Sequence, residues 1–229
     1  MPDADTEAPP LPAPERAALR RLVARAPLLA RIEAQAGPLP WRRRAPGFPG
    51  LFAAIVGQQI SNHAAAAIWR RLVALMDGRP NAAALLALPD AALSGAGLSR
   101  PKIAYARGLA EAVATGRLDP SAFPSMPDEE VIDAITALPG FGRWSAEIYL
   151  LFALGRRDAF PAADLALAAS AAHLCGLAAR PGEKALRALA EPWAPWRGLA
   201  ARLLWHHWRH VNRRPAAPSS LPSRKDPPA

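Results

Sequence analysis

The sequence of 229 residues predicts an all-α fold. Its apolar residues recur at intervals of three and four rather than two, which is the period of a helix surface and not of a strand. Valine, isoleucine and threonine do not form the clusters that mark strands. With 51% hydrophobic residues the chain can bury one large core, so we expect one compact unit, with room for two lobes.

Prolines, glycines and capping residues mark where the expected helices begin and end. The first helix runs from Glu15 to Gln35 with an interruption near Pro27, because proline cannot continue a helix. After the loop GPLPWRRRAPGFPG, a helix begins near Leu51 and ends within the segment GQQIS. The remaining helices are expected from His63 to about Met76, from Asn81 to Leu86, from Pro89, after Ser99, from Pro127 to Leu138, from about Arg143, from about Leu165 to Leu177 and from about Trp196 to Val211.

Both ends of the chain are rich in proline and small polar residues, which bury little apolar surface. We therefore expect disordered tails over residues 1–15 and 214–229, and one folded unit over residues 16–213.

The charge balance favours a polyanionic partner. Lysine and arginine outnumber the acids by 28 to 19, a net charge of +9 that is typical of nucleic-acid-binding proteins, although arginine-rich surfaces also serve solubility. The single cysteine, Cys175, excludes disulfide frameworks and all-cysteine metal sites. The N-terminal segment lacks the apolar core of a secretory signal, and no run of about eighteen apolar residues is present. We expect a cytoplasmic protein without membrane contact, associated with the nucleoid if it is bacterial.

The segment LPGFGRWSAEIYL, residues 138–150, joins two expected helices through a proline and two glycines. Pro139 ends the first helix, and Gly140 and Gly142 allow backbone angles that a side chain would resist. The second helix then begins near Arg143, so its free N–H groups can converge with those of the glycines on one phosphate of a nucleic-acid backbone. The same spacing suits an ordinary tight hairpin in which the glycines only cap the helices.

This segment resembles the hairpin of the helix-hairpin-helix (HhH-GPD) DNA glycosylases, base-excision enzymes with an aspartate downstream of a Gly/Pro-rich turn. The aspartate is present in AFPAADLAL, where Asp164 follows Gly142 by twenty-two residues. Three further segments resemble the 3-methyladenine DNA glycosylase II branch and occur in the same order as there: PLPWRRRAPGFPGLFAAIVGQQIS, ALPDAALSGAGLSRPKIAYARGLAEAV and PWRGLAARLLWHHW. The resemblance covers most of residues 37–210.

The resemblance implies two helical lobes with the active-site cleft between them: lobe A over about 16–50 and 165–213, and lobe B over about 51–164. It implies that double-stranded DNA with damaged bases is the partner, and that alkylated purines of the 3-methyladenine type are flipped out and released by hydrolysis. We expect a monomer with no required cofactor. The resemblance also implies that carbonyls of the hairpin turn hold a monovalent cation.

Asp164 is the expected catalytic residue. Cleavage of an N-glycosidic bond builds positive charge on the sugar, which one carboxylate can stabilise while it orients the attacking water. A second acid is not needed if the leaving base is already cationic. Aspartate is also a preferred helix N-cap, so the alternative role of Asp164 is to cap the helix that follows it. The two roles are compatible.

The base pocket is expected to be walled by Trp144 and Trp205, whose indole faces attract a cationic base. The resemblance places Trp144 where strand-nicking members carry a nucleophilic lysine, so we expect a monofunctional enzyme that leaves an abasic site. Tyr149 is assigned to the pocket as well, because the resembling branch has a tyrosine one helical turn after Trp144, at the position of Ile148. Core packing is the alternative for these aromatic residues.

The GQQIS segment matches the loop from which these enzymes insert a side chain into the base stack. Gln59 is the expected wedge and Ile60 the second choice, whereas the alternative is that Gln58 and Gln59 hydrogen-bond the ends of neighbouring helices. Lys102 is expected to face phosphate or solvent. The residues assigned to DNA contact are Gln58, Gln59, Ile60, Gly140, Phe141, Gly142, Arg143 and Ser145.

Three histidines, His206, His207 and His210, have helical spacing, but no other ligand has a clear placement beside them, and we expect no metal site. Two other functions stay open: a non-catalytic helix-hairpin-helix module that only binds DNA, and a glycosylase for oxidised or deaminated bases. Asp164 speaks against the first, because a pure binder needs no carboxylate after an apolar Phe-Pro-Ala-Ala approach.

Overall fold

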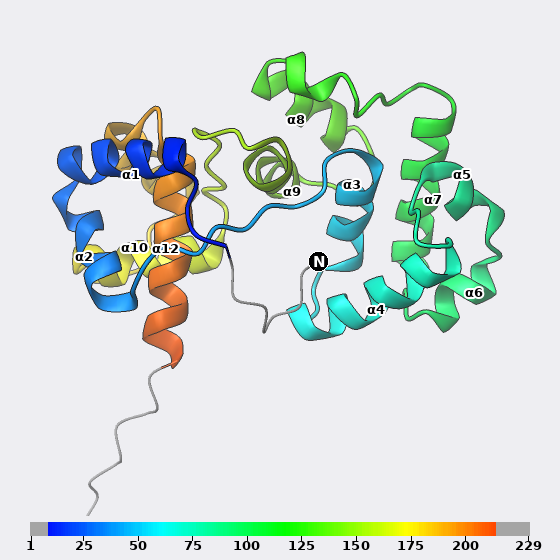
Figure 1. Cartoon of the computed structure of the whole chain (residues 1–229), viewed down its shortest axis with the longest axis horizontal. Helices are drawn as coiled ribbons and strands as arrows, with labels where there is room; N and C mark the ends of the chain where they lie inside the picture. Colours follow the sequence, from blue (N-terminus) through cyan, green and yellow to red (C-terminus); the bar gives the residue numbers. More distant parts are fainter. Residues whose placement is uncertain (1–8, 214–229) are drawn as a thin grey trace, which may run out of the picture.

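The computed structural model describes residues 9–213, and regular structure in this range is helical throughout (Figure 1). The all-α prediction is confirmed. The α-helices are α1 (Ala13–Arg25), α2 (Pro27–Ala36), α3 (Gly47–Val56), α4 (Asn62–Leu75), α5 (Ala82–Ala87), α6 (Asp90–Gly95), α7 (Arg100–Ala114), α8 (Asp128–Thr136), α9 (Arg143–Tyr149), α10 (Leu165–Cys175), α11 (Glu183–Ala190) and α12 (Arg197–Arg213). A π-helical turn, Leu150–Leu154, continues α9. Within the described range, no helix combines the length and the apolar character that crossing a bilayer requires.

The helices form two groups (Figure 1). In one group α12 packs against both α2 and α10, with α1 and α11 beside them. In the other group α7 contacts α3, α5 and α6, while α9 contacts α3 and α8. One continuous hydrophobic core runs through both groups. The lobes that the resemblance implies therefore share a core, and their boundaries stay a prediction.

The N-terminal boundary differs from the sequence-based expectation. Helix α1 begins at Ala13, Leu11 is buried, and the N–H of Trp41 donates to the carbonyl of Pro9 at 3.2 Å. Residues 9–15 are thus packed rather than part of a tail, because Leu11 finds an apolar site among the helices. The remainder of the two predicted tails, residues 1–8 and 214–229, lies outside the described residues.

Two other elements also differ from the expectation. Helix α3 begins at Gly47 and not near Leu51, because Pro49 falls in the first turn, where the N–H that proline lacks would have no partner within the helix. Helix α11 is not expected from the sequence. Its eight residues bury only Leu186 and Ala190, so its apolar signal is short.

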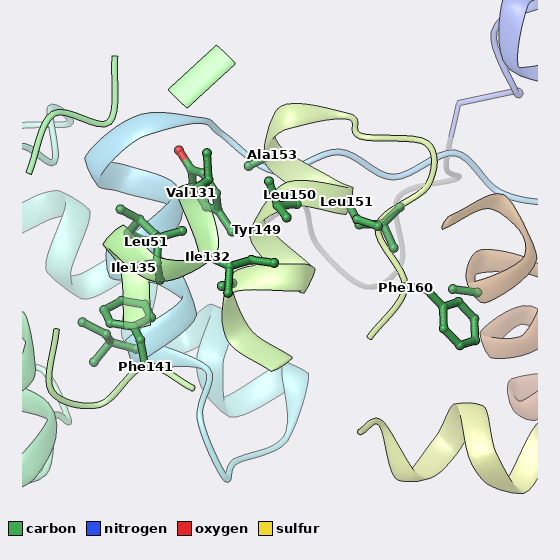
Figure 2. Close-up of a cluster of buried hydrophobic side chains, with 14 of the residues drawn as sticks. Leu51, Val131, Ile132, Ile135, Phe141, Tyr149, Leu150, Leu151, Ala153 and Phe160 are labelled. Carbon is green, nitrogen blue, oxygen red and sulfur yellow. The ribbon is translucent and has the colours of Figure 1, made fainter. Parts of the chain in front are cut away.

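The two helices that flank the hairpin pack through one buried apolar face (Figure 2). Val131, Ile132 and Ile135 of α8 lie on this face, together with Phe141 of the turn and Leu150 after α9. Burial of each such side chain stabilises the fold by about 1.5 to 3 kcal/mol. This apolar face of α8 holds the hairpin against the core.

A buried arginine fixes the segment that precedes α3. Arg202 of α12 donates to the carbonyls of Arg42 and Leu151, at 2.7 and 2.9 Å, and its guanidinium lies 4.2 Å from the ring centres of both Trp41 and Phe152. Burial lowers the pKa of Arg202 to about 10, so the side chain is charged at neutral pH. Segment 41–44 is thereby held against the π-helical turn.

Charged side chains join α8, α9 and α11 behind the hairpin. Arg143 donates to the two carboxylate oxygens of Glu129, at 2.6 and 2.9 Å, and to Glu147 Oε1 at 3.1 Å. Arg187 of α11 donates to the same Glu147 oxygen at 3.1 Å. Glu147 is only 3% exposed, and burial raises the pKa of its carboxyl although both guanidinium groups oppose the shift.

The substitution Glu147→Gln tests this buried charge. A carboxyl whose pKa is raised by folding binds more protons in the folded than in the unfolded protein, so its contribution to stability falls as pH rises through the raised pKa. Glutamine does not titrate. We expect the wild type to gain stability relative to Glu147→Gln as the pH is lowered from 7 to 5. Urea unfolding of both proteins at the two pH values measures the difference, and an unchanged difference would contradict the assignment.

Candidate active site

A cleft of about 1020 Å³ lies between the two helix groups. Its walls come from α3, α7 and α9 on one side and from α12 and the start of α10 on the other. Asp164 is the one acidic side chain among the described residues that line it. Of the residues predicted from the sequence, those that line the cleft are Gln58, Gln59, Gly140, Trp144, Ser145, Asp164 and Trp205.

The carboxylate of Asp164 is held by four hydrogen bonds. Its Oδ1 accepts from the backbone N–H groups of Ala166 and Leu167, both at 2.9 Å, which makes Asp164 the N-cap of α10. The indole N–H of Trp205 donates to the same oxygen at 3.1 Å. The indole N–H of Trp144 donates to Oδ2 at 3.0 Å. Oδ1 thus has three donors, and Oδ2 keeps the larger free capacity to accept a hydrogen bond.

The two indoles differ in their surroundings. Trp205 of α12 packs against Phe152, with ring centres 5.6 Å apart, and is partly buried. Trp144 of α9 is 41% exposed, so part of its side chain is accessible to an incoming group. Ile60 and Leu165, the chain neighbours of the cleft residues Gln59 and Asp164, are 37% and 69% exposed. Three exposed large apolar side chains, those of Trp144, Ile60 and Leu165, therefore belong to the cleft or to residues next to it in the sequence.

The hairpin turn between α8 and α9 depends on one of its two glycines. Gly140 has φ +89°, and a Cβ there would lie 2.5 Å from ring atoms of Tyr105. Gly142, the N-cap of α9, has φ −108°, an extended angle that other residues adopt, and a Cβ there would meet no atom within 4 Å. The expectation that both glycines need unusual angles is therefore correct for Gly140 and wrong for Gly142.

The loop between α3 and α4 forms another side of the cleft. Gln59 is exposed and has φ +54°, in the left-handed region that favours glycine. Gln58 does not point at a ligand, because its amide Nε2 donates to the carbonyl of Gly140 at 2.7 Å. Lys102 donates to the carbonyls of Val56 and Gln58, at 2.7 and 2.8 Å, and burial lowers its pKa. The alternative role proposed for Gln58, a contact at neighbouring helix ends, is the one observed.

Residues 52–195 match the family described as "HhH-GPD superfamily base excision DNA repair protein". The chain belongs to this superfamily. The HhH-GPD resemblance and the fold expected from the sequence are thus confirmed.

Similar proteins carry one recurring description. "DNA-3-methyladenine glycosylase 1" of Schizosaccharomyces pombe is 30% identical over 158 residues, which are 68% of this chain and 69% of that protein. The crystal structure of a DNA-3-methyladenine glycosidase from Bacillus halodurans has a TM-score of 0.76 and 32% identity, over 86% of this chain and 91% of the other. The S. pombe 3-methyladenine DNA glycosylase Mag1 in complex with abasic DNA has a TM-score of 0.69 and 27% identity, over 82% and 89%.

Several predicted site residues of this HhH-GPD protein lie outside the cleft. Tyr149 is 3% exposed and its hydroxyl accepts the N–H of Gly47 at 2.7 Å, so its assignment to the base pocket is wrong. One residue shifts the direction of a helical side chain by about 100°, and Ile148 lines the cleft instead. Phe141 is buried in the core (Figure 2). Arg143 is engaged by Glu129 and Glu147, and Gly142 does not line the cleft.

Other cleft residues are not predicted from the sequence. Tyr105 lies beneath Gly140, and Lys102, expected at phosphate or solvent, is turned to carbonyl groups. Arg209 lines the cleft one helical turn after Trp205, a spacing that could have identified it. Arg43 and Arg44, from the loop GPLPWRRRAPGFPG, also line it.

Two histidines of α12, His206 and His207, make contacts within the fold. His207 is buried, and its Nε2 lies 3.0 Å from Nδ1 of His173. Nε2 of His206 lies 3.0 Å from the carbonyl oxygen of Gly37. Burial lowers the pKa of both His206 and His207. Across residues 9–213, no three His, Cys, Asp or Glu side chains are grouped as metal ligands.

A pair of alanine substitutions tests the hairpin geometry. Gly140→Ala combines an unfavourable backbone angle with contact against Tyr105, and we expect it to lower the free energy of unfolding by about 2 kcal/mol or more. Gly142→Ala is the matched control, with an expected loss of no more than about 1 kcal/mol, because alanine is a poorer N-cap than glycine but meets no steric conflict there. Urea unfolding monitored by circular dichroism measures both. Equal losses in the two variants would contradict the special role of Gly140.

Proposed function

We propose that this protein is a DNA glycosylase that flips a damaged base out of duplex DNA and releases it by hydrolysis. The single observation that carries the proposal is the Asp164 carboxylate, held by backbone and indole donors in a cleft large enough to admit a nucleotide. The preferred substrates are alkylated purines of the 3-methyladenine type, as the names of the similar proteins suggest.

The chemistry follows from the asymmetry of the carboxylate. Oδ1 is occupied by three donors, so Oδ2 is the oxygen that faces the sugar. As the bond between C1′ and the base nitrogen breaks, its electron pair leaves with the base and positive charge grows on the sugar. Oδ2 stabilises that charge and orients a water whose oxygen bonds to C1′, and the proton that this water loses passes to Oδ2 and from there to solvent. An alkylated purine leaves as a neutral base, because it carries a positive charge before the bond breaks.

The aromatic walls select for such a base. The exposed part of Trp144 and the ring of Trp205 lie beside the carboxylate, where a flipped base would enter. A desolvated cation–π contact contributes about 1 to 2 kcal/mol, which favours a cationic base over a neutral one. The product is an abasic site in the DNA.

The cleft surroundings suit a DNA duplex. Arg43 and Arg44 supply positive charge for phosphates, and we assign the exposed Gln59 to the space that the flipped base vacates. The hairpin is assigned to one phosphate of the same strand. Turn carbonyls such as those of Leu138 and Gly140 each accept one protein N–H and keep a second lone pair, so a monovalent cation fits there. A monomeric, cytoplasmic enzyme stays our prediction.

Among the described residues, the cleft contains no free amine that could act as the nucleophile of a lyase step. Trp144 stands where strand-nicking relatives carry lysine, and the one lysine among the described cleft residues, Lys102, donates to two carbonyls. Water is therefore the attacking group.

The substitution Asp164→Asn separates chemistry from folding. Asparagine caps helices as well as aspartate does, so α10 should keep its N-cap and Tm should change little. We expect release of methylated bases from methylated duplex DNA to fall by about a hundredfold or more, because the negative charge is lost. Single-turnover base release with Tm as the control provides the test. Equal release by both proteins would remove Asp164 from catalysis, and no release by the wild type would favour a non-catalytic DNA-binding module.

Borohydride trapping tests the water mechanism independently. A Schiff base between an amine and the sugar would be reduced to a stable protein–DNA adduct, whereas hydrolysis leaves none. We expect no adduct between the wild type and duplex DNA from which it releases a base. A trapped adduct that disappears in Lys102→Met would identify a lyase and contradict the proposal.

A further inference from the structure

Gln59 holds a backbone angle that it does not favour by itself. Its φ of +54° lies in the left-handed region, and its side chain is exposed at the cleft. Non-glycine residues persist in this region when the surrounding structure determines the backbone around them. The contacts that determine it here come from outside the loop.

Lys102 of α7 fixes the peptide plane that precedes Gln59. Its ammonium donates to the carbonyl of Val56, the last residue of α3, and to the carbonyl of Gln58. The Gln58 carbonyl belongs to the same planar peptide group as the N–H of Gln59. Holding that oxygen therefore restricts rotation about the bond that defines φ of Gln59. A cation also suits the negative end of a helix, here the C-terminus of α3.

The loop that Lys102 holds is also connected to the hairpin. The Gln58 amide donates to the carbonyl of Gly140 at 2.7 Å, and Gly140 lies on the ring of Tyr105. Tyr105 follows Lys102 by three residues, so both side chains project from one face of α7. One face of α7 thus supports the loop that carries Gln59 and the turn assigned to phosphate.

We propose that Lys102 and Gln58 are positioning residues that hold Gln59 in its inserting conformation at a fixed distance from the hairpin turn. This inference rests on the proposed function, because insertion has a purpose only where a base is flipped. Neither residue contacts the reacting atoms. Their effect is on the ability of the protein to fill a gap in the base stack while it holds the adjacent strand.

Binding measurements test the inference without any chemical step. Fluorescence anisotropy compares the affinity for an intact duplex with the affinity for the same duplex carrying one tetrahydrofuran abasic analogue, where the gap is already present. We expect the wild type to prefer the abasic duplex, and Lys102→Met to lose about tenfold of that preference with little change in affinity for the intact duplex. Gln58→Met, which leaves the Lys102 contacts in place, should lose preference in the same direction.

Arg107→Met is the matched control. Arg107 also lies on α7 and also donates to backbone carbonyls, those of Leu85, Leu86 and Leu88, but it does not line the cleft. Its removal should leave the preference for the abasic duplex unchanged. A merely structural role for Lys102 would instead lower the affinity for both duplexes by one common factor, and that result would overturn the proposal.

Two further measurements separate positioning from direct contact. If Lys102 acts through Gln59, the double variant Lys102→Met/Gln59→Ala should lose no more preference than Gln59→Ala alone. The dependence of affinity on salt should stay unchanged in Lys102→Met, whereas loss of a direct phosphate contact would reduce its slope by about one. Additive losses, a reduced slope or a wild type without preference would each overturn the inference. Failure of the wild type to release any base would count against the proposed function alone.

Discussion

The position of the Asp164 carboxylate depends on three helices at once. Its oxygens accept hydrogen bonds from the first turn of α10, from Trp205 on α12 and from Trp144 on α9. These helices come from both groups of the fold, so the position of one side chain depends on how the groups pack. A small displacement of α9 or α12 would lengthen an indole hydrogen bond and turn the carboxylate. The continuous core and the ion pairs between α8, α9 and α11 are what resist that displacement.

A second constraint acts on the backbone rather than on a charge. Gly140 approaches Tyr105 so closely that no side chain fits between them, and the turn is thereby set at a fixed height above α7. Part of the positive charge of the chain lies in the cleft beside this turn. Arg43, Arg44 and Arg209 line a cleft in which the described walls carry one acid. The basic side chains of such a cleft attract a polyanion, while the negative charge of its described lining is confined to Asp164.

The helices could be predicted from sequence because their signals are local, whereas Asp164, the residue that we propose as catalytic, is identified through the family resemblance of its segment. Proline, glycine and apolar spacing locate most helix boundaries, and the AFPAADLAL segment locates Asp164 beside the helix that it caps. The assignment of Tyr149 to the pocket is wrong because its spacing from Trp144 does not determine the direction of its side chain. Its hydrogen-bond partner, Gly47, lies far away in the sequence. The contacts of Arg143, Gln58 and Lys102 likewise depend on residues brought together only by folding. Composition and spacing carry no information about such partners.

The exposed apolar rim of the cleft has a consequence for the free protein. Trp144, Leu165 and Ile60 expose apolar surface to water when no nucleic acid covers them. Exposed apolar surface promotes self-association. The surplus of arginine opposes it, since two molecules that approach through their rims bring like charges together. The basic character of the chain therefore also serves colloidal stability, and high salt, which screens that repulsion, favours aggregation of the unliganded protein.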